Sequence, residues 1–174
     1  IAKEHAAFTL RDISTGIVQK LIYRHPHVFG STHVDSSGEV LYNWEQLKRK
    51  EKRQATATEA MQAVPRAFPA LMRSAKVQKK AAHAGFDWPD AQGALDKLPE
   101  ERLELIEAIE EGDQAHVDEE IGDILFAAVN VARLLGRDPE AMLHQSTDKF
   151  MNRFGLMESR ILQEGISLCD MSLD

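Results

Sequence analysis

The 174-residue chain carries 43% hydrophobic and 28% charged residues, a composition that predicts a globular protein with a buried core. Its formal net charge of −7 argues against a protein that coats nucleic acid, and no apolar run reaches the length of a membrane-spanning helix. A single cysteine excludes an internal disulfide framework, and with no signal peptide before the first helix we expect a cytoplasmic protein.

The first third of the chain predicts two helices separated by joints. Apolar residues at helical spacing indicate a helix over 5–24, which should end just before Pro26 because proline disfavours helical geometry in the residue that precedes it. The turn-rich stretch 30–38 predicts a linker, and a second helix should follow over about 40–54. Residues 55–63 predict a second joint.

The rest of the chain predicts four helices and no strand, hence an all-α protein built as a four-helix bundle with short loops. The expected bounds are about 69–84, 91–111, 114–135 and 138–163. Gly112 and Gly136 should end the second and third of these helices, and Asp113 and Asp138 should cap the helices that follow.

Two of these helices carry apolar residues at core spacing, and we expect both faces to be buried. The residues are Leu95, Leu98, Leu105, Ile106 and Ile109 on the second helix, and Val117, Ile121, Ile124, Leu125, Ala128, Val131 and Ala132 on the third.

Acidic pairs occur on the same two helices. Glu101 and Glu104 lie about 60° apart around the first of them, and Glu120 and Asp123 repeat this spacing on the next. Carboxylates brought together repel each other unless a cation neutralises them or most are protonated. Because carboxylate oxygens suit hard cations, we predict a Mg²⁺ site, with Mn²⁺ also possible, beside space left open by the small Ala127. The alternative is two acidic helices that face water, since glutamate is simply a good helix former.

Several other side chains could hold a phosphate substrate on such a metal. Lys149 and Arg153 lie one turn apart on the last helix, and Lys97 lies one turn before the first acidic pair. These cations could neutralise a polyphosphate, Trp88 could stack on a base, and Asn130 shares the stripe of the second acidic pair. Surface positions for the cations and a place at the edge of the core for the tryptophan are the alternatives.

The C-terminal two-thirds resembles the MazG family of nucleoside triphosphate pyrophosphohydrolases. The resemblance is carried by Glu100-Glu101-x-x-Glu104, Asp118-Glu-Glu-Ile-Gly-Asp-Ile-Leu-Phe126, Asn130, Gly85-Phe-Asp-Trp88 and Lys149-Phe-Met-Asn-Arg153. It implies a homodimer that hydrolyses a nucleoside triphosphate to a monophosphate and pyrophosphate. The metal ligands implied are Glu101, Glu104, Glu120 and Asp123. The candidate substrate-binding residues are Lys97, Glu100, Glu119, Asp123, Asn130, Lys149, Arg153 and Trp88.

The mechanism expected from this resemblance uses carboxylates and cations together. A water activated by the metal or by a carboxylate, with Glu100 or Glu101 as catalytic candidates, would attack the α-phosphorus. Lys149, Arg153 and Lys97 would neutralise the charge that develops on the phosphate oxygens. The alternative is a non-catalytic MazG-like module for dimerisation or partner binding. A di-iron bundle requires Glu-x-x-His on two helices, and the sequence contains none.

The first third resembles a piece of the tandem-domain form of this family. We predict that residues 1–29 are the terminal helix of an incomplete upstream repeat, 30–64 a linker with an inter-domain helix, and 65–174 the catalytic domain. The carboxylate motifs of the upstream repeat are absent, so this part cannot carry a complete site. Neither a membrane nor nucleic acid is an expected partner.

Overall fold

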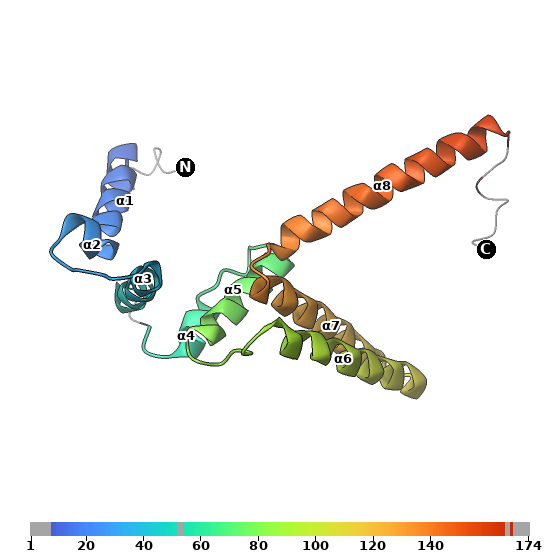
Figure 1. Ribbon diagram of the computed structural model, residues 1–174, viewed down its shortest axis with the longest axis horizontal. Helices are drawn as coiled ribbons and strands as arrows, with labels where there is room; N and C mark the ends of the chain where they lie inside the picture. The colour runs from blue at the N-terminus through green and yellow to red at the C-terminus, as the bar shows by residue number, and fades with distance from the viewer. Residues whose placement is uncertain (1–7, 52–53, 166–167, 169–174) are drawn as a thin grey trace. The chain divides into compact units, whose positions relative to one another are not determined.

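The computed structural model describes residues 8–51, 54–165 and 168, and this part of the chain is helical with no strand (Figure 1). The predicted all-α fold is therefore confirmed. The chain divides into two compact units, residues 1–60 and 61–174. No helix among the described residues is long and apolar enough to cross a membrane.

The first unit contains α1 (Leu10–Arg24), α2 (Pro26–Phe29) and α3 (Ser37–Glu51). Helix α1 contacts both of the others. Arg24, at the end of α1, is buried and donates from Nε to Glu51 Oε2 at 2.6 Å. Its guanidinium also lies over the Trp44 ring, 5.7 Å from the centroid. These contacts hold the end of α1 against α3.

Capping residues place the starts of the first helices differently from the prediction. Helix α1 begins at Leu10 because the Thr9 hydroxyl accepts from the Asp12 amide, while Asp12 accepts from the Thr9 amide at 2.8 Å. Residues 5–7 of the predicted helix lie outside the described residues. Helix α3 begins at Ser37, three residues earlier than predicted, and the Ser36 hydroxyl accepts from an amide of its first turn.

Two short helices were not predicted. Helix α2 starts at Pro26 itself, because proline is compatible with the first helical position. Helix α4 (Ala57–Gln62) occupies the stretch predicted to be a joint. It starts with a capping box in which the Thr56 hydroxyl accepts from the Glu59 amide and the Glu59 carboxylate accepts from the Thr56 amide.

The second unit contains the four long helices that the sequence predicts. They are α5 (Ala70–Ala82), α6 (Ala91–Glu111), α7 (Gln114–Leu134) and α8 (Pro139–Gln163). Helices α6 and α7 form an antiparallel hairpin and share the most extensive contact in the unit (Figure 1). Gly112 ends α6 in the left-handed conformation at φ 75°, and the Asp113 carboxylate accepts from two amides at the start of α7. Both predictions for this turn are confirmed.

Helices α5 and α8 attach to this hairpin in different ways. Helix α5 packs against α7, where Gln78 Nε2 donates to the Phe126 carbonyl at 2.8 Å. Helix α8 contacts α5 and α7, and Glu140 in its first turn accepts from the Met72 amide. Most of the length of α8 is exposed and runs away from the hairpin (Figure 1).

The prediction of buried faces on α6 and α7 was wrong for several large side chains. Ile109 is 58% exposed and Leu125 51% exposed, and Leu95, Ile106, Ile121 and Ala128 are exposed as well. The buried apolar residues of the hairpin are instead smaller ones, Ala94, Ala108, Ala127 and Val129. Small residues bring the two helices close together, whereas no other helix of the described chain covers these larger apolar side chains.

Candidate functional site

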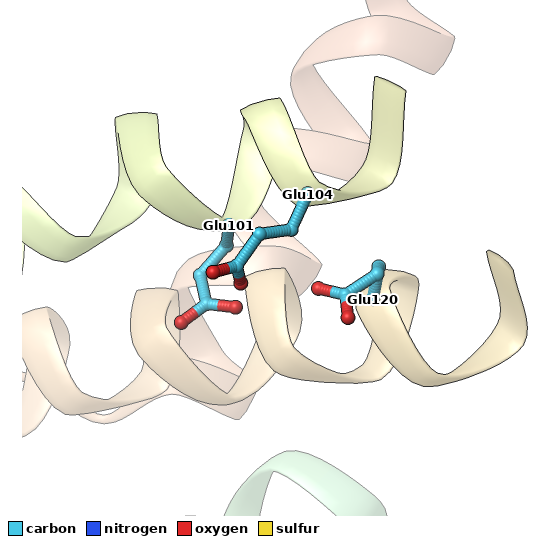
Figure 2. A group of neighbouring side chains, drawn as sticks. All are labelled: Glu101, Glu104 and Glu120. Atoms are coloured by element: carbon cyan, nitrogen blue, oxygen red, sulfur yellow. The ribbon is translucent and has the colours of Figure 1, made fainter. Parts of the chain in front are cut away.

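Three carboxylates converge at the seam of the hairpin. Glu101 and Glu104 reach from α6 toward Glu120 on α7, as Figure 2 shows. One ligand atom from each residue lies within 4.8 Å of the others. Glu101 is 6% exposed and Glu120 7% exposed, so two of these acids are buried among the small side chains of the seam. The geometry follows from the sequence, because residues three apart share one side of α6 and the short turn folds α7 back against it.

The buried carboxylates are only partly satisfied by protein groups. Glu120 Oε1 lies 3.2 Å from His116 Nε2, while Glu120 Oε2 is buried with no hydrogen-bond partner among the described residues. The pKa of Glu104 is raised, chiefly because the carboxylate is desolvated and also because Glu101 and Glu120 are near, although Lys97 opposes the shift. A buried oxygen without a donor is costly, and a cation would satisfy it.

The donor set fits a hard divalent cation. All three groups are carboxylates, and Mg²⁺ and Mn²⁺ prefer oxygen ligands. A cation at this position would relieve the mutual repulsion of the acids and complete the coordination of the unpartnered oxygen of Glu120. The residues present therefore fit the predicted metal.

Lys97 lies at the edge of this group. Its Nζ lies 3.1 Å from Glu100 Oε1 and 3.1 Å from Glu101 Oε1. The hydrogen bonds with Glu100 and then with Glu101 raise the pKa of Lys97 above its usual value, so the ammonium stays charged. One lysine thus joins an exposed carboxylate to a buried one at the edge of the cluster.

Comparison with known proteins places this geometry in a family. The model of the MazG nucleotide pyrophosphohydrolase domain matches residues 90–155, which include all three carboxylates. The full chain is 40% identical over 176 residues to the "Nucleoside triphosphate pyrophosphohydrolase" of Escherichia coli (strain K12), of which it covers 67%. The chain belongs to the MazG family. The family recognised from the sequence is thereby confirmed, and with it the prediction of an enzyme at the level of the family.

Two further relatives match the whole of this MazG chain. It is 40% identical over 174 residues to the Thermotoga maritima "Nucleoside triphosphate pyrophosphohydrolase/pyrophosphatase MazG", of which it spans 65%. It is 42% identical over 175 residues to the "Uncharacterized protein YabN" of Bacillus subtilis, of which it spans 36%. The similarity therefore extends beyond the matched domain into the first unit.

The structure does not bring every predicted MazG site residue to the cluster. Asp123, the fourth predicted ligand, is exposed one turn after Glu120 and lies outside the group of three. Glu119 is also exposed. Lys149 and Arg153 are exposed on α8, and neither forms an ion pair with the three carboxylates within the described part of the chain. Their predicted roles stay predictions.

Ala127 is buried on α7, at 9% exposed, seven residues after Glu120 and thus on the same stripe of the helix. The open space expected beside it stays a prediction. Trp88 and Asn130, the remaining predicted substrate residues, lie at the opposite end of the hairpin from the α6–α7 turn. Trp88 is 44% exposed, and Asn130 is half-buried.

Sequence reasoning missed two residues that contact predicted site residues. His116 lies one turn before Glu120, and this i,i+4 spacing could have indicated the contact. Arg133 donates to Asn130 Oδ1 from Nε at 3.0 Å and from Nη2 at 2.6 Å. It also pairs with Asp87, which is 46 residues away in sequence, and no local pattern indicates that contact.

Proposed function

We propose that this MazG chain hydrolyses nucleoside triphosphates to nucleoside monophosphates and pyrophosphate, with Mg²⁺ held by Glu101, Glu104, Glu120 and Asp123. The observation that carries the proposal is the convergence of carboxylates from two helices within 4.8 Å, with one buried oxygen of Glu120 left without a donor. The names of the Escherichia coli and Thermotoga maritima relatives support the same reaction.

The metal would supply charge neutralisation for the triphosphate and polarisation of the scissile phosphorus–oxygen bond. The protein carboxylates hold it, and Glu120 keeps its orientation through His116. Oxygen ligands also admit Mn²⁺. Lys97 stays charged beside Glu100 and Glu101, where it offers a counter-charge to phosphate oxygens.

The chemical step is an attack of water on the α-phosphorus. A bond forms between the water oxygen and phosphorus, the bond from phosphorus to the α–β bridging oxygen breaks, and pyrophosphate leaves. A carboxylate accepts the proton of the water, with Glu100 and Glu101 as the candidates. Glu100 is the more accessible of the two, since its side chain is 58% exposed and that of Glu101 is 8% exposed.

The remaining substrate contacts belong to the two ends of the nucleotide. Lys149 and Arg153 on α8 would bind phosphate oxygens, and Glu119 is a further candidate on α7. Trp88 and Asn130 would bind the nucleoside. Lys149 and Arg153 do not pair with the carboxylates within the described part of the chain. Their contribution to phosphate binding therefore depends on which molecule packs against α8.

A homodimer is part of the proposal. Helix α8 exposes large apolar side chains along its length, as do α6 and α7, and many exposed apolar side chains on packed helices are typical of an interface. A second copy of the chain would cover these faces. The same association would bring Lys149 and Arg153 close to a carboxylate cluster.

A product assay tests the proposed reaction. The purified chain is incubated with a panel of ribonucleoside and deoxyribonucleoside triphosphates and Mg²⁺, and monophosphate and pyrophosphate are measured. Release of both in equal amounts is expected. The uncovered apolar faces also favour a non-catalytic dimerisation or partner-binding module, and absence of hydrolysis with every nucleotide would favour that function instead.

A further inference from the structure

We propose that Arg133 is a positioning residue that fixes Trp88 and Asn130 for the nucleoside end of the substrate. The inference rests on the proposed function and concerns how the protein orients the residues that bind one end of the nucleotide. It starts from a group of contacts, here called the Arg133 clamp, formed by Arg133, Asp87 and Asn130 at the end of the hairpin opposite its turn.

Arg133 divides its donors between two elements. Nη1 donates to Asp87 Oδ2 at 3.0 Å, and Nη2 donates to the other oxygen of the same carboxylate, which makes the pair bidentate. Nε and Nη2 also reach Asn130 Oδ1 on the preceding turn of α7. One guanidinium thus joins α7 to the loop that enters α6.

The pair with Asp87 is more than a surface contact. The Arg133 side chain is 14% exposed and that of Asp87 is 29% exposed. The hydrogen bonds from Arg133 hold the pKa of Asp87 below its usual value, so the carboxylate is ionised at neutral pH. A partly buried bidentate pair of this kind orients both partners as well as attracting them.

Asp87 connects Arg133 to Trp88. Its Oδ1 accepts from the Trp88 amide at 2.9 Å, so the carboxylate that Arg133 holds also fixes the start of the tryptophan backbone. The Trp88 ring then packs on α6 at Gly93, where an added Cβ would lie 2.5 Å from Trp88 Cε3. Only glycine leaves room for the ring in this position.

Arg133 also fixes which side of the Asn130 amide is available. A guanidinium can only donate, so the amide must turn its oxygen toward Arg133. The Nδ2 group then remains as the donor that a ligand can use. The chemistry predicted for this position is therefore donation from Asn130 to an acceptor of the nucleoside, either a base carbonyl or ring nitrogen or a ribose oxygen.

The clamp lies far from the carboxylate cluster. Asn130 follows Glu120 by ten residues on one helix, which is about 15 Å along the axis at about 1.5 Å per residue. An extended nucleoside triphosphate is of comparable length. Loss of the clamp should therefore weaken binding of the nucleoside and leave binding of metal and phosphate unchanged.

The main experiment compares Arg133→Gln and Arg133→Lys with the wild-type chain, using the nucleotide that the wild type hydrolyses best. Arg137, an exposed arginine just beyond α7, provides the matched control Arg137→Gln. Arg133→Gln should raise KM about tenfold, with a smaller change in kcat and an unchanged inhibition constant for inorganic tripolyphosphate. Arg133→Lys should not restore KM, because an ammonium cannot hold both partners in the fork geometry.

Two further variants separate the parts of the clamp. Asn130→Asp keeps an oxygen for Arg133 but replaces the free donor with an acceptor, so KM should rise while the loop stays in place. Gly93→Ala removes a helix-disfavouring residue but displaces the Trp88 ring, so KM should rise without loss of helix stability. Arg133→Lys, which retains the positive charge, keeps the test of Arg133 possible if Arg133→Gln does not fold.

Trp88 fluorescence gives a readout that is independent of activity. In a Trp44→Phe background Trp88 is the single tryptophan of the chain. Its emission and its quenching by acrylamide should change in Arg133→Gln and Gly93→Ala and stay as in the parent in Asn130→Asp and Arg137→Gln. Unchanged Trp88 emission and quenching in Arg133→Gln would overturn the positioning role, because Gly93→Ala displaces the ring whether or not Arg133 holds it.

The failure of this inference differs from the failure of the proposed function. If the wild-type chain hydrolyses no nucleotide, the proposed function fails and the clamp has no role in it. If the wild type is active and Arg133→Gln keeps its KM, only the inference is overturned. Full recovery of KM in Arg133→Lys, or an equal loss of tripolyphosphate binding, would also overturn it, since either result would assign Arg133 a simple charge effect.

Discussion

Glu104 shows how one residue of the cluster can be tested without disturbing the fold. Glu104 is half-buried and lies beside two buried acids. Glu104→Gln keeps the size of the side chain and removes the charge. We expect hydrolysis to fall by more than about a hundredfold, because a lost ligand charge weakens metal binding directly.

The measurement is kcat at saturating Mg²⁺, with circular dichroism to verify helix content. Glu107→Gln is the matched control, since Glu107 lies exposed one turn further along α6 and outside the cluster. Near-wild-type turnover of Glu104→Gln would remove this residue from the metal site. Asp123→Asn tests the exposed fourth ligand in the same assay.

Asp87 gives a prediction for pH. Its pKa is lowered in the folded protein, chiefly by the hydrogen bonds from Arg133, so its contribution to stability is present above the unfolded pKa. That contribution is lost as the pH falls below the ordinary aspartate value of 3.8 and through the lower folded pKa. Asp87→Asn should therefore lower the midpoint of thermal unfolding at pH 7 and differ less from the wild type at the acid end.

A series of melts between pH 7 and pH 2.5 measures this difference. The difference in melting temperature between wild type and Asp87→Asn should shrink as the pH falls. A difference that widens on acidification would show that the ion pair does not stabilise the fold. Asp118→Asn is the control, because Asp118 is exposed and lies outside the Arg133 clamp. Asp90 is unsuitable because it caps α6.

For single residues, the sequence predicted the contacts that depend on spacing within one helix or across the tight turn. Glu101, Glu104 and Glu120 meet because helical spacing and a short turn bring them together. The pairing of Asp87 with Arg133 could not be predicted, because it depends on the register of two helices over the full length of the hairpin. Asp123 could not be placed either, since its position relative to Glu120 does not specify which way the carboxylate turns.

Among the elements, the turn between α6 and α7 determines how the acids meet. Asp113 accepts from the amides of Ala115 and His116, which would otherwise lack partners in the first turn of α7. Asp113→Ala should lower the free energy of unfolding by about 1 kcal/mol, the usual cost of losing a side-chain cap. Denaturant unfolding measures this, and Glu110→Ala on the exposed side of α6 is the control. An equal stability of the two variants would contradict a capping role.

Helix ends were predictable wherever a residue has one strong preference. Gly112 adopts the left-handed conformation, and Asp138 followed by Pro139 starts α8, as the sequence indicated. Helix α4 was missed although its capping box, Thr56 to Glu59, is visible in the sequence, because alanine and threonine around it were interpreted as a joint. The faces of α6 and α7 were misjudged for another reason: periodicity identifies an apolar face but not what covers it.

For the molecule as a whole, metal binding should be linked to stability. The carboxylates repel each other in the metal-free fold, and a ligand that binds only the folded state stabilises it by RT ln(1 + [L]/Kd), about 2.7 kcal/mol at a hundredfold excess over Kd. Millimolar Mg²⁺ should therefore raise the melting temperature, and Glu101→Gln should lose much of this gain. An unchanged midpoint in the wild type would mean that the acids do not form a metal site.

The second prediction at this scale concerns association. Phe150 is 66% exposed on α8 beside Phe154, so a charge placed there should not harm the single chain. We expect the wild type to sediment as a dimer and Phe150→Glu to shift toward the monomer. Gln145→Glu adds the same charge at an exposed polar position of α8 and should leave the mass unchanged. A wild-type chain that sediments as a monomer at micromolar concentration would exclude the proposed homodimer.

The three acids of the carboxylate cluster lie close together in the sequence, which affects the order in which parts of the chain fold during synthesis. They come from residues 101–120, so the chain needs only one local hairpin to bring them together. Ribosomes add about 5–20 residues per second, whereas local helical structure forms in about a microsecond or less. The hairpin can therefore gather its negative charges before α8, which follows it in the chain, has packed against α5 and α7. The carboxylates would then meet the Mg²⁺ of their surroundings before the helix that carries Lys149 and Arg153 is in place.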